Sequence, residues 1–127
     1  MRRIFKLVRF SRWCRKSGLS DEALARAVKE MASGLIDADL GGNIYKKRIP
    51  LPGRGKRGST RTLVATNLGS HWFFLFGLEK NDRENFSPAE MATVRELARM
   101  YLKMDNTALD SAVAQGIFEE VSDDESQ

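Results

Sequence analysis

Residues 71–78 (HWFFLFGL) constrain the fold of this chain more than any other segment. The segment is almost wholly apolar and rich in aromatic residues, which is typical of a central strand buried on both faces. Leu68-Gly69-Ser70 before it and the β-rich segment 60–67 predict a hairpin. A further strand is predicted over residues 43–49. Three consecutive strands with short connections predict an antiparallel meander.

Helix signals flank this meander. Ser20 is a typical N-cap, and an apolar stripe predicts a helix over residues 19–33. Ser87-Pro88-Ala89-Glu90 combines a capping box with proline at the first helical position, which predicts a helix from 87 to about 103. Before these helices, the sequence predicts a short strand at 4–8 and a first helix that ends near Gly18. We therefore expect an α+β fold, with two N-terminal helices and a C-terminal helix packed on the sheet.

Charge divides the chain unevenly. Residues 105–127 carry seven acids and no base, so residues 1–104 carry 21 basic and 10 acidic groups, a formal net charge of +11. We expect one domain over residues 1–105, followed by an acidic extension over 106–127 with a short helix at 107–114 and a disordered tail. A cationic body indicates a polyanionic partner, nucleic acid first, although unevenly solvated charge would give the same composition.

Several features favour a cytoplasmic protein. The single cysteine, Cys14, cannot form an internal disulfide. No apolar stretch approaches the roughly 18 to 20 residues of a membrane helix. The apolar run at the N-terminus is broken by Lys6 and Arg9 and lacks a small-residue cleavage site, so we do not expect a signal peptide. We expect no membrane segment.

Residues 41–62 (GGNIYKKRIPLPGRGKRGSTRT) carry seven basic residues and no acid. The basic residues are Lys46, Lys47, Arg48, Arg54, Lys56, Arg57 and Arg61. Strand alternation predicts Ile44, Lys46 and Arg48 on one face and Tyr45, Lys47 and Ile49 on the other. Glycines and prolines make the middle of the segment a loop. A strand, a loop and a second strand thus present positive charge that can bind phosphates.

Other chemistries fit this segment poorly. One cysteine and one histidine cannot build a structural zinc site or a two-histidine ribonuclease. GRGKRGST differs from a P-loop because Ser59 stands where lysine is required. Residues 40–78 contain no acid, and we expect neither a metal nor a cofactor. Arginines and lysines can cleave RNA by stabilising the charge that develops when the 2′-OH attacks phosphate. Simple nucleic-acid binding would need the same residues.

The run KKRIPLPGRGKRGSTRTLVA, the aromatic strand and GLEKNDREN together resemble the RelE/HigB superfamily of toxin–antitoxin ribonucleases over residues 4–105. The most specific pieces are G-x-G-K-R-G-x-x-R at 53–61 and G-x-x-K-N at 77–81. The resemblance implies a RelE/ParE-like fold and a ribosome-dependent mRNA endoribonuclease that inhibits translation. It also implies a cognate antitoxin, typically a small DNA-binding protein.

We expect nine basic residues at the site, and the resemblance implies the roles of six of them, Lys46, Arg48, Lys56, Arg57, Arg61 and Lys80. The expected catalytic residues are Arg61, Lys80, Lys56 and Arg57, and the expected RNA-binding residues are Lys46, Lys47, Arg48, Arg54 and Arg83. Arg61 and Lys80 would stabilise the transition state, while Lys56 and Arg57 would hold the phosphate. Family members often end in a basic segment with tyrosine or histidine, whereas this chain ends in acids. The general acid and base therefore stay unassigned.

Three questions stay open at this point. The chain could be a non-catalytic RNA- or DNA-binding module, or an inactive relative that only binds an antitoxin. The acidic tail could fold back over the basic face. Seven basic residues within 1–16 could contact ribosomal RNA or form a solvated helix face. We expect His71 to have a structural or exposed role and the aromatic residues of 71–78 to lie in the core.

Overall fold

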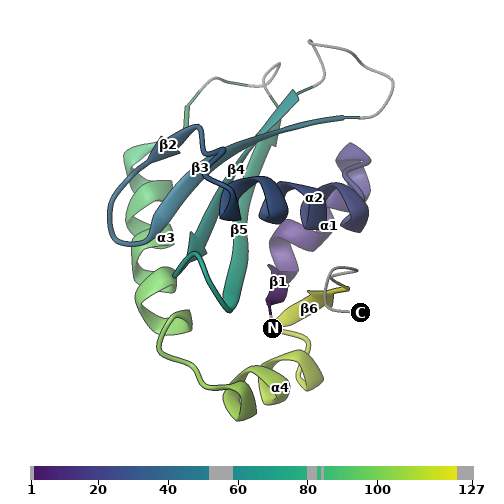
Figure 1. The fold of residues 1–127 in the computed structure, drawn as a ribbon, viewed down its shortest axis with the longest axis vertical. Coiled ribbons are helices and arrows are strands. Elements are labelled where there is room, and N and C mark those ends of the chain that lie inside the picture. Colours follow the sequence, from purple (N-terminus) through teal and green to yellow (C-terminus); the bar gives the residue numbers. More distant parts are fainter. Residues whose placement is uncertain (1, 52–58, 80–82, 84, 123–127) are drawn as a thin grey trace.

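The computed structural model describes residues 2–51, 59–79, 83 and 85–122. Within these residues, helices lie on both faces of one mixed sheet (Figure 1). The elements in chain order are β1 (Arg3–Leu7), α1 (Val8–Ser17), α2 (Asp21–Ala32), β2 (Ala38–Asp39), β3 (Ile44–Pro50), β4 (Ser59–Thr66), β5 (His71–Glu79), α3 (Pro88–Tyr101), α4 (Asn106–Ala114) and β6 (Phe118–Val121). None of the helices described is long and apolar enough to cross a membrane.

The meander expected from the sequence is present. The strand order is β2-β3-β4-β5-β1-β6, and β4 pairs antiparallel with both β3 and β5. β5 is central: Trp72, Phe73 and Phe74 are completely buried. A register shift opposite Leu63 and Val64 marks a β-bulge in β5. The apolar run is therefore a strand covered on both faces, and the α+β fold is confirmed.

Two features extend the sheet beyond the meander. β1 pairs parallel with β5, and β6 pairs antiparallel with β1. The sequence did not predict a strand over 118–121, because FEEV is short and its two acids hide the apolar pattern. The helix expected at 107–114 is α4. Residues 106–121, which the sequence suggested were an extension, thus contribute an edge strand to the same sheet.

The two faces of the sheet have separate cores. α1 and α2 pack on one face, where Phe10, Leu24 and Val28 meet Trp72 and Phe74. α3 and α4 pack on the other face, where a second cluster is formed by Phe5, Ile44, Leu63, Phe73, Val94, Ala98, Tyr101, Leu109 and Phe118. We call these the α1 face and the α3 face. They decide which side of the molecule each strand residue occupies.

The helix boundaries follow from local capping. The Ser20 side chain accepts a hydrogen bond from the amide of Ala23 at 3.2 Å. Ser87 and Glu90 form the expected capping box at the start of α3, which satisfies amide groups that lack a partner within the helix. α1 ends at Gly18, whose φ of 86° is easily adopted by glycine. These signals place the helices close to their predicted bounds.

Ion pairs tie β6 to the beginning of the chain. Arg3 donates to Glu120 at 2.8 Å and to Asp110 at 2.7 Å. Lys6, which is mostly buried, lies 2.7 Å from Asp21 and 3.5 Å from Glu119. The packing of Phe118 against aromatic rings of β1 and β5 adds apolar burial. The edge strand is therefore held by both charge and packing.

Candidate active site

Strands β3 and β4 bring three of the expected basic residues to one face. Arg48 lies opposite Arg61, and Lys46 lies opposite Leu63. Side chains directly opposite each other in an antiparallel pair share a face. Because Leu63 packs with α3, Lys46, Arg48 and Arg61 all belong to the α3 face. The alternation predicted for residues 43–49 is confirmed.

Arg48 and Arg61 lie near one end of the sheet, where β3 ends, β4 begins and β5 ends (the upper end in Figure 1). Leu78 of β5 lies beside Arg61 on the same face. Like charges directly opposite each other destabilise a strand pair. Placing two arginines there is therefore unfavourable for the free protein, and an anion bound between them would relieve the repulsion.

Arg61 is the most unusual of these residues. Its side chain is buried, with a relative exposure of 7% for the residue, and its Nη1 atom has no hydrogen-bond partner among the described residues. A guanidinium stays charged inside proteins and carries five N–H donors. Leaving a buried charged donor unpaired costs free energy. A bound phosphate oxygen would supply the acceptor that the described protein groups do not.

Lys47 does not join this group. It faces α2, and its Nζ atom lies 2.9 Å from the Glu30 carboxylate and donates to the Leu35 carbonyl at 2.9 Å. Its relative exposure is 6%. Although the sequence suggested RNA binding, the structure makes Lys47 a buried cation that joins α2 to β3. Its expected role depended on basic character alone, and its partner Glu30 is distant in sequence.

Arg83 is tied to the start of α3. Its Nη1 atom donates to Glu90 Oε1 at 2.6 Å, and its Nη2 atom binds the second oxygen. The same carboxylate accepts a hydrogen bond from the Ser87 amide at 2.7 Å. The Arg83 hydrogen bonds are the main reason why the pKa of Glu90 falls to about 2. Edge-to-face contact of Phe86 with Phe76 holds this end of α3 over the sheet.

Four expected site residues lie outside the part of the chain that the structure describes. They are Arg54, Lys56, Arg57 and Lys80. Their roles stay predictions. The described strands flank them: β3 ends, β4 begins and β5 ends beside Arg48, Arg61 and Leu78.

No described histidine, tyrosine or cysteine is placed to transfer a proton at Arg61. His71 starts β5, and seven residues at about 3.3 Å each separate it from Leu78. Its ring contacts Asn106 Oδ1 at 3.1 Å, which fits the structural role expected for it. Tyr101 is buried, and this burial raises its pKa. Burial raises the pKa of the Cys14 thiol to about 12.

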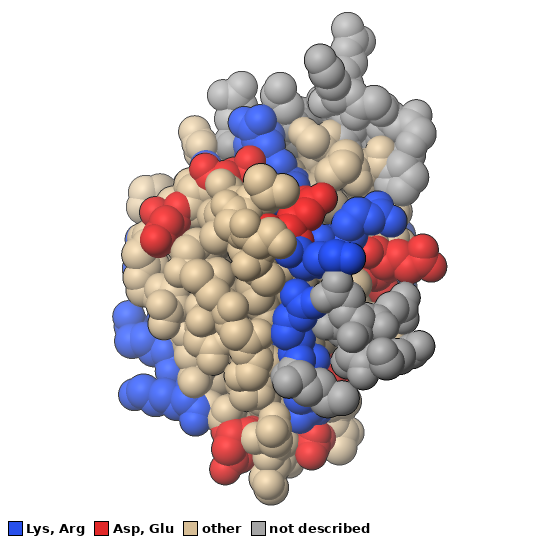
Figure 2. Space-filling model, in the orientation of Figure 1, with Lys and Arg blue, Asp and Glu red and all other residues tan. Residues whose placement is uncertain are grey.

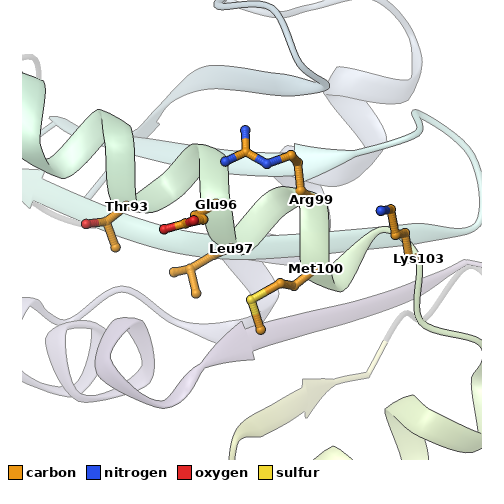
Figure 3. A pocket seen from close by; sticks show the side chains of 6 residues that line it. All are labelled: Thr93, Glu96, Leu97, Arg99, Met100 and Lys103. Carbon is orange, nitrogen blue, oxygen red and sulfur yellow. The ribbon is translucent and has the colours of Figure 1, made fainter.

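Two further observations concern possible chemistry elsewhere on the described surface. Among the residues described, no group of three or more histidines, cysteines and acids could hold a metal ion. A hollow of about 410 Å³ lies on the outer side of α3 (Figure 3). Its lining residues are Thr93, Glu96, Leu97, Arg99, Met100 and Lys103. They come from α3 and the residues just after it and mix both charge signs with apolar groups, so they do not form a reaction centre.

Comparison with known protein families agrees with this geometry. A family model described as the RelE toxin of the RelE/RelB toxin–antitoxin system matches residues 2–121. The match includes α4 and β6 as well as the meander. Searches of curated proteins and of solved structures found no significant match. The family match spans nearly the whole chain, and the chain therefore belongs to the RelE family of toxins from toxin–antitoxin systems.

Proposed function

We propose that this RelE-family toxin is an endoribonuclease that cuts mRNA on the ribosome and so inhibits translation in the cytoplasm. The observation that carries the proposal is the pairing of Arg48 with a buried Arg61 whose Nη1 atom has no hydrogen-bond partner among the described residues. Family membership supports it. The proposed partner is a cognate antitoxin, a small DNA-binding protein.

In the proposed reaction the ribose 2′-oxygen attacks the adjacent phosphorus. The P–O2′ bond forms and the P–O5′ bond breaks, which leaves a 2′,3′-cyclic phosphate and a 5′-hydroxyl. Negative charge develops on the phosphoryl oxygens, and the Arg61 guanidinium stabilises it from a site largely shielded from water. Arg48 and Lys46 hold flanking phosphates. Lys80 acts with Arg61, and Lys56 and Arg57 hold the scissile phosphate.

Cleavage on ribosomes tests the proposal directly. We expect purified toxin to cut mRNA on programmed ribosomes, with ends that primer extension maps, and Arg61→Ala to abolish cutting. Arg26→Ala also removes one positive charge, but from an exposed position on α2, and this control variant should retain activity. Failure of the wild-type toxin to cut ribosome-bound mRNA would refute the proposed reaction.

The reaction needs no metal at the scissile phosphate. A phosphorothioate at that position distinguishes metal-free from metal-assisted cleavage. A thiophilic ion restores cleavage only when a metal contacts the substituted oxygen. We expect Mn²⁺ and Cd²⁺ to give no rescue. Rescue by either ion would show that metal chemistry participates.

A second candidate is an inactive relative that keeps only antitoxin or nucleic-acid binding. The observation in its favour is that His71 lies at the far end of β5 and Tyr101 lies in the core. This candidate predicts stable co-purification with the antitoxin encoded beside it, but no mRNA ends on induction and no growth arrest. Growth arrest that depends on Arg61 would exclude it.

A further inference from the structure

Every exposed residue of α1 is basic. These residues are Arg9, Arg12, Arg15 and Lys16. Arg15 lies 3.4 Å from Glu119, within ion-pair distance. Arg9, Arg12 and Lys16 make no ion pair or side-chain hydrogen bond with any described residue. We call these three residues the α1 stripe.

Helical spacing places the α1 stripe on one side of the helix. The positions follow an i, i+3, i+7 pattern, so the three side chains project within about 60° of one another. The spacing therefore gathers the three charges into one cationic stripe. The face drawn in Figure 2 also has a column of Lys and Arg side chains.

The stripe is unfavourable for the free protein. Arg12 lies three residues from Arg9 and four from Lys16, and like charges at these spacings repel each other. Arg9 also lies in the first helical turn, where the helix dipole disfavours positive charge and no acid is present. Two described acids near this helix already have partners: Glu119 accepts a hydrogen bond from Ser11 and pairs with Arg15 and Lys6, and Asp21 pairs with Lys6. An external anion would neutralise the stripe.

The surroundings of the stripe favour a phosphate backbone over a protein partner. Stable protein interfaces have an apolar centre. The exposed large apolar residues of the described chain are Leu35, Leu68, Met100 and Ile117, and none of them belongs to α1. Arginine and lysine side chains alone are sufficient to bind phosphates along a nucleic acid.

The stripe and the candidate active site lie on opposite faces of the sheet. α1 packs on the α1 face through Phe10 and Cys14, whereas Arg61 belongs to the α3 face. The RNA segment held at Arg61 is thus separated from the stripe by the sheet. We propose that the α1 stripe binds the sugar–phosphate backbone of structured RNA on the ribosome and holds the toxin there while mRNA occupies the α3 face. The ribosomal location rests on the proposed function, whereas the RNA-binding surface does not.

Binding to empty ribosomes tests the inference without any cleavage. The stripe variant combines Arg9→Gln, Arg12→Gln and Lys16→Gln. Glutamine has about the same helix propensity as arginine and lysine, so the helix should be retained. We expect its affinity for 70S ribosomes to fall roughly ten- to hundredfold near physiological salt, and the slope of log affinity against log salt to fall by about two to three. Thermal unfolding should show equal or higher stability, because like-charge repulsion is removed.

The matched control is Arg26→Gln, Arg99→Gln and Lys103→Gln. It removes the same charge from exposed positions on α2, on α3 and just after α3, and it should retain ribosome affinity. Equal loss in both variants would overturn the inference, because net charge alone would then explain binding. Unchanged affinity of the stripe variant, or loss of antitoxin binding alone, would also overturn it.

Cleavage separates this inference from the proposed function. If the wild-type toxin cuts mRNA and the stripe variant binds ribosomes with unchanged affinity, only the α1 inference is overturned. Stripe-dependent binding by a wild-type toxin that leaves mRNA intact would refute the proposed reaction alone.

Discussion

The indole ring of Trp13 lies against the backbone of Gly77, and a Cβ atom added at Gly77 would come within 2.5 Å of Trp13 Cζ3. Gly77 lies opposite Thr62, and its neighbour Leu78 lies opposite Arg61. Gly77, which contacts Trp13 of α1, and Leu78, which lies beside Arg61, are therefore consecutive residues of β5. Packing against Trp13 therefore explains the glycine of the G-x-x-K-N segment.

Replacing Gly77 with alanine should destabilise the protein by about 1–3 kcal/mol, because a well-packed site must move to admit the new methyl group. Urea unfolding measures the change. Gly69→Ala is the control, since its added Cβ would lie no closer than 3.6 Å to Asn67 Oδ1. Similar losses of unfolding free energy in the two variants would show that the Trp13 contact does not cause the destabilisation at Gly77.

Arg61→Met should abolish cleavage while raising the free energy of unfolding by about 1–3 kcal/mol, because it removes a buried N–H group that has no partner among the described residues. Urea unfolding and cleavage on ribosomes measure the two effects. A loss of stability would instead indicate that Arg61 has a structural partner in the folded protein.

Lys47→Met is the matched substitution on the other face. It leaves the Glu30 carboxylate and the Leu35 carbonyl without their cation. We expect a loss of about 1–3 kcal/mol in unfolding free energy and unchanged cleavage per folded molecule. Loss of cleavage without loss of stability would return Lys47 to the RNA-binding residues.

The contrast between Arg61 and Lys47 shows what the sequence could predict. Strand alternation over residues 43–49, the buried strand β5 and the capping box at Ser87 depend on neighbouring residues, and all three were confirmed. Such signals are local, so a single sequence contains them. They also predicted which residues share a face with Lys46.

Long-range pairing was not predictable in the same way. The Glu30–Lys47 pair joins a helix to a strand, and β6 pairs with β1 more than 100 residues away in the chain. The sequence pattern of 118–121 has no strand alternation strong enough to be recognised. Arg83 was expected at the RNA surface, and its bond to the capping carboxylate of Glu90 depends on how the chain enters α3.

Acid should weaken the start of α3 through Glu90. The pKa of Glu90 in the folded protein is about 2, against 4.5 for the free group. A lowered folded pKa means that the stabilisation is fully present above about pH 4.5 and is lost as pH falls toward 2. We expect Glu90→Gln to remove this part of the pH dependence, measured by urea unfolding from pH 7 to pH 2.

Ser87→Ala provides the comparison for Glu90. It removes the hydroxyl that caps Glu90 but leaves the Arg83 ion pair. It should lower stability by about 1 kcal/mol at all pH values and keep most of the acid dependence. Parallel pH curves for the wild type and Glu90→Gln would show that the Arg83 pair does not stabilise the fold.

The last prediction concerns the acidic C-terminus. Val121 lies beside Ile4, which lies beside Trp72, so β6 ends at the end of the sheet away from Arg61. Six residues of β5 at about 3.3 Å each and three strand spacings of about 4.8 Å separate Val121 from Arg61. Glu125 is four residues beyond Val121, so its Cα atom lies at most about 14 Å from that of Val121. This is well below the separation of Val121 and Arg61, so we do not expect the acids at 123–125 to cover the Arg61 guanidinium.

Deletion after Ser122 should leave ribosome binding, cleavage and unfolding free energy unchanged. Deletion after Met104 should instead prevent folding, because it removes Phe118 and Leu109 from the second core, together with the acidic partners of Arg3 and the Glu119 partner of Lys6. Losing a buried phenylalanine alone costs about 3–5 kcal/mol, a large part of the stability of a domain this size. Increased cleavage after the shorter deletion would show that the tail inhibits the site, and a folded product of the longer deletion would show that β6 is dispensable.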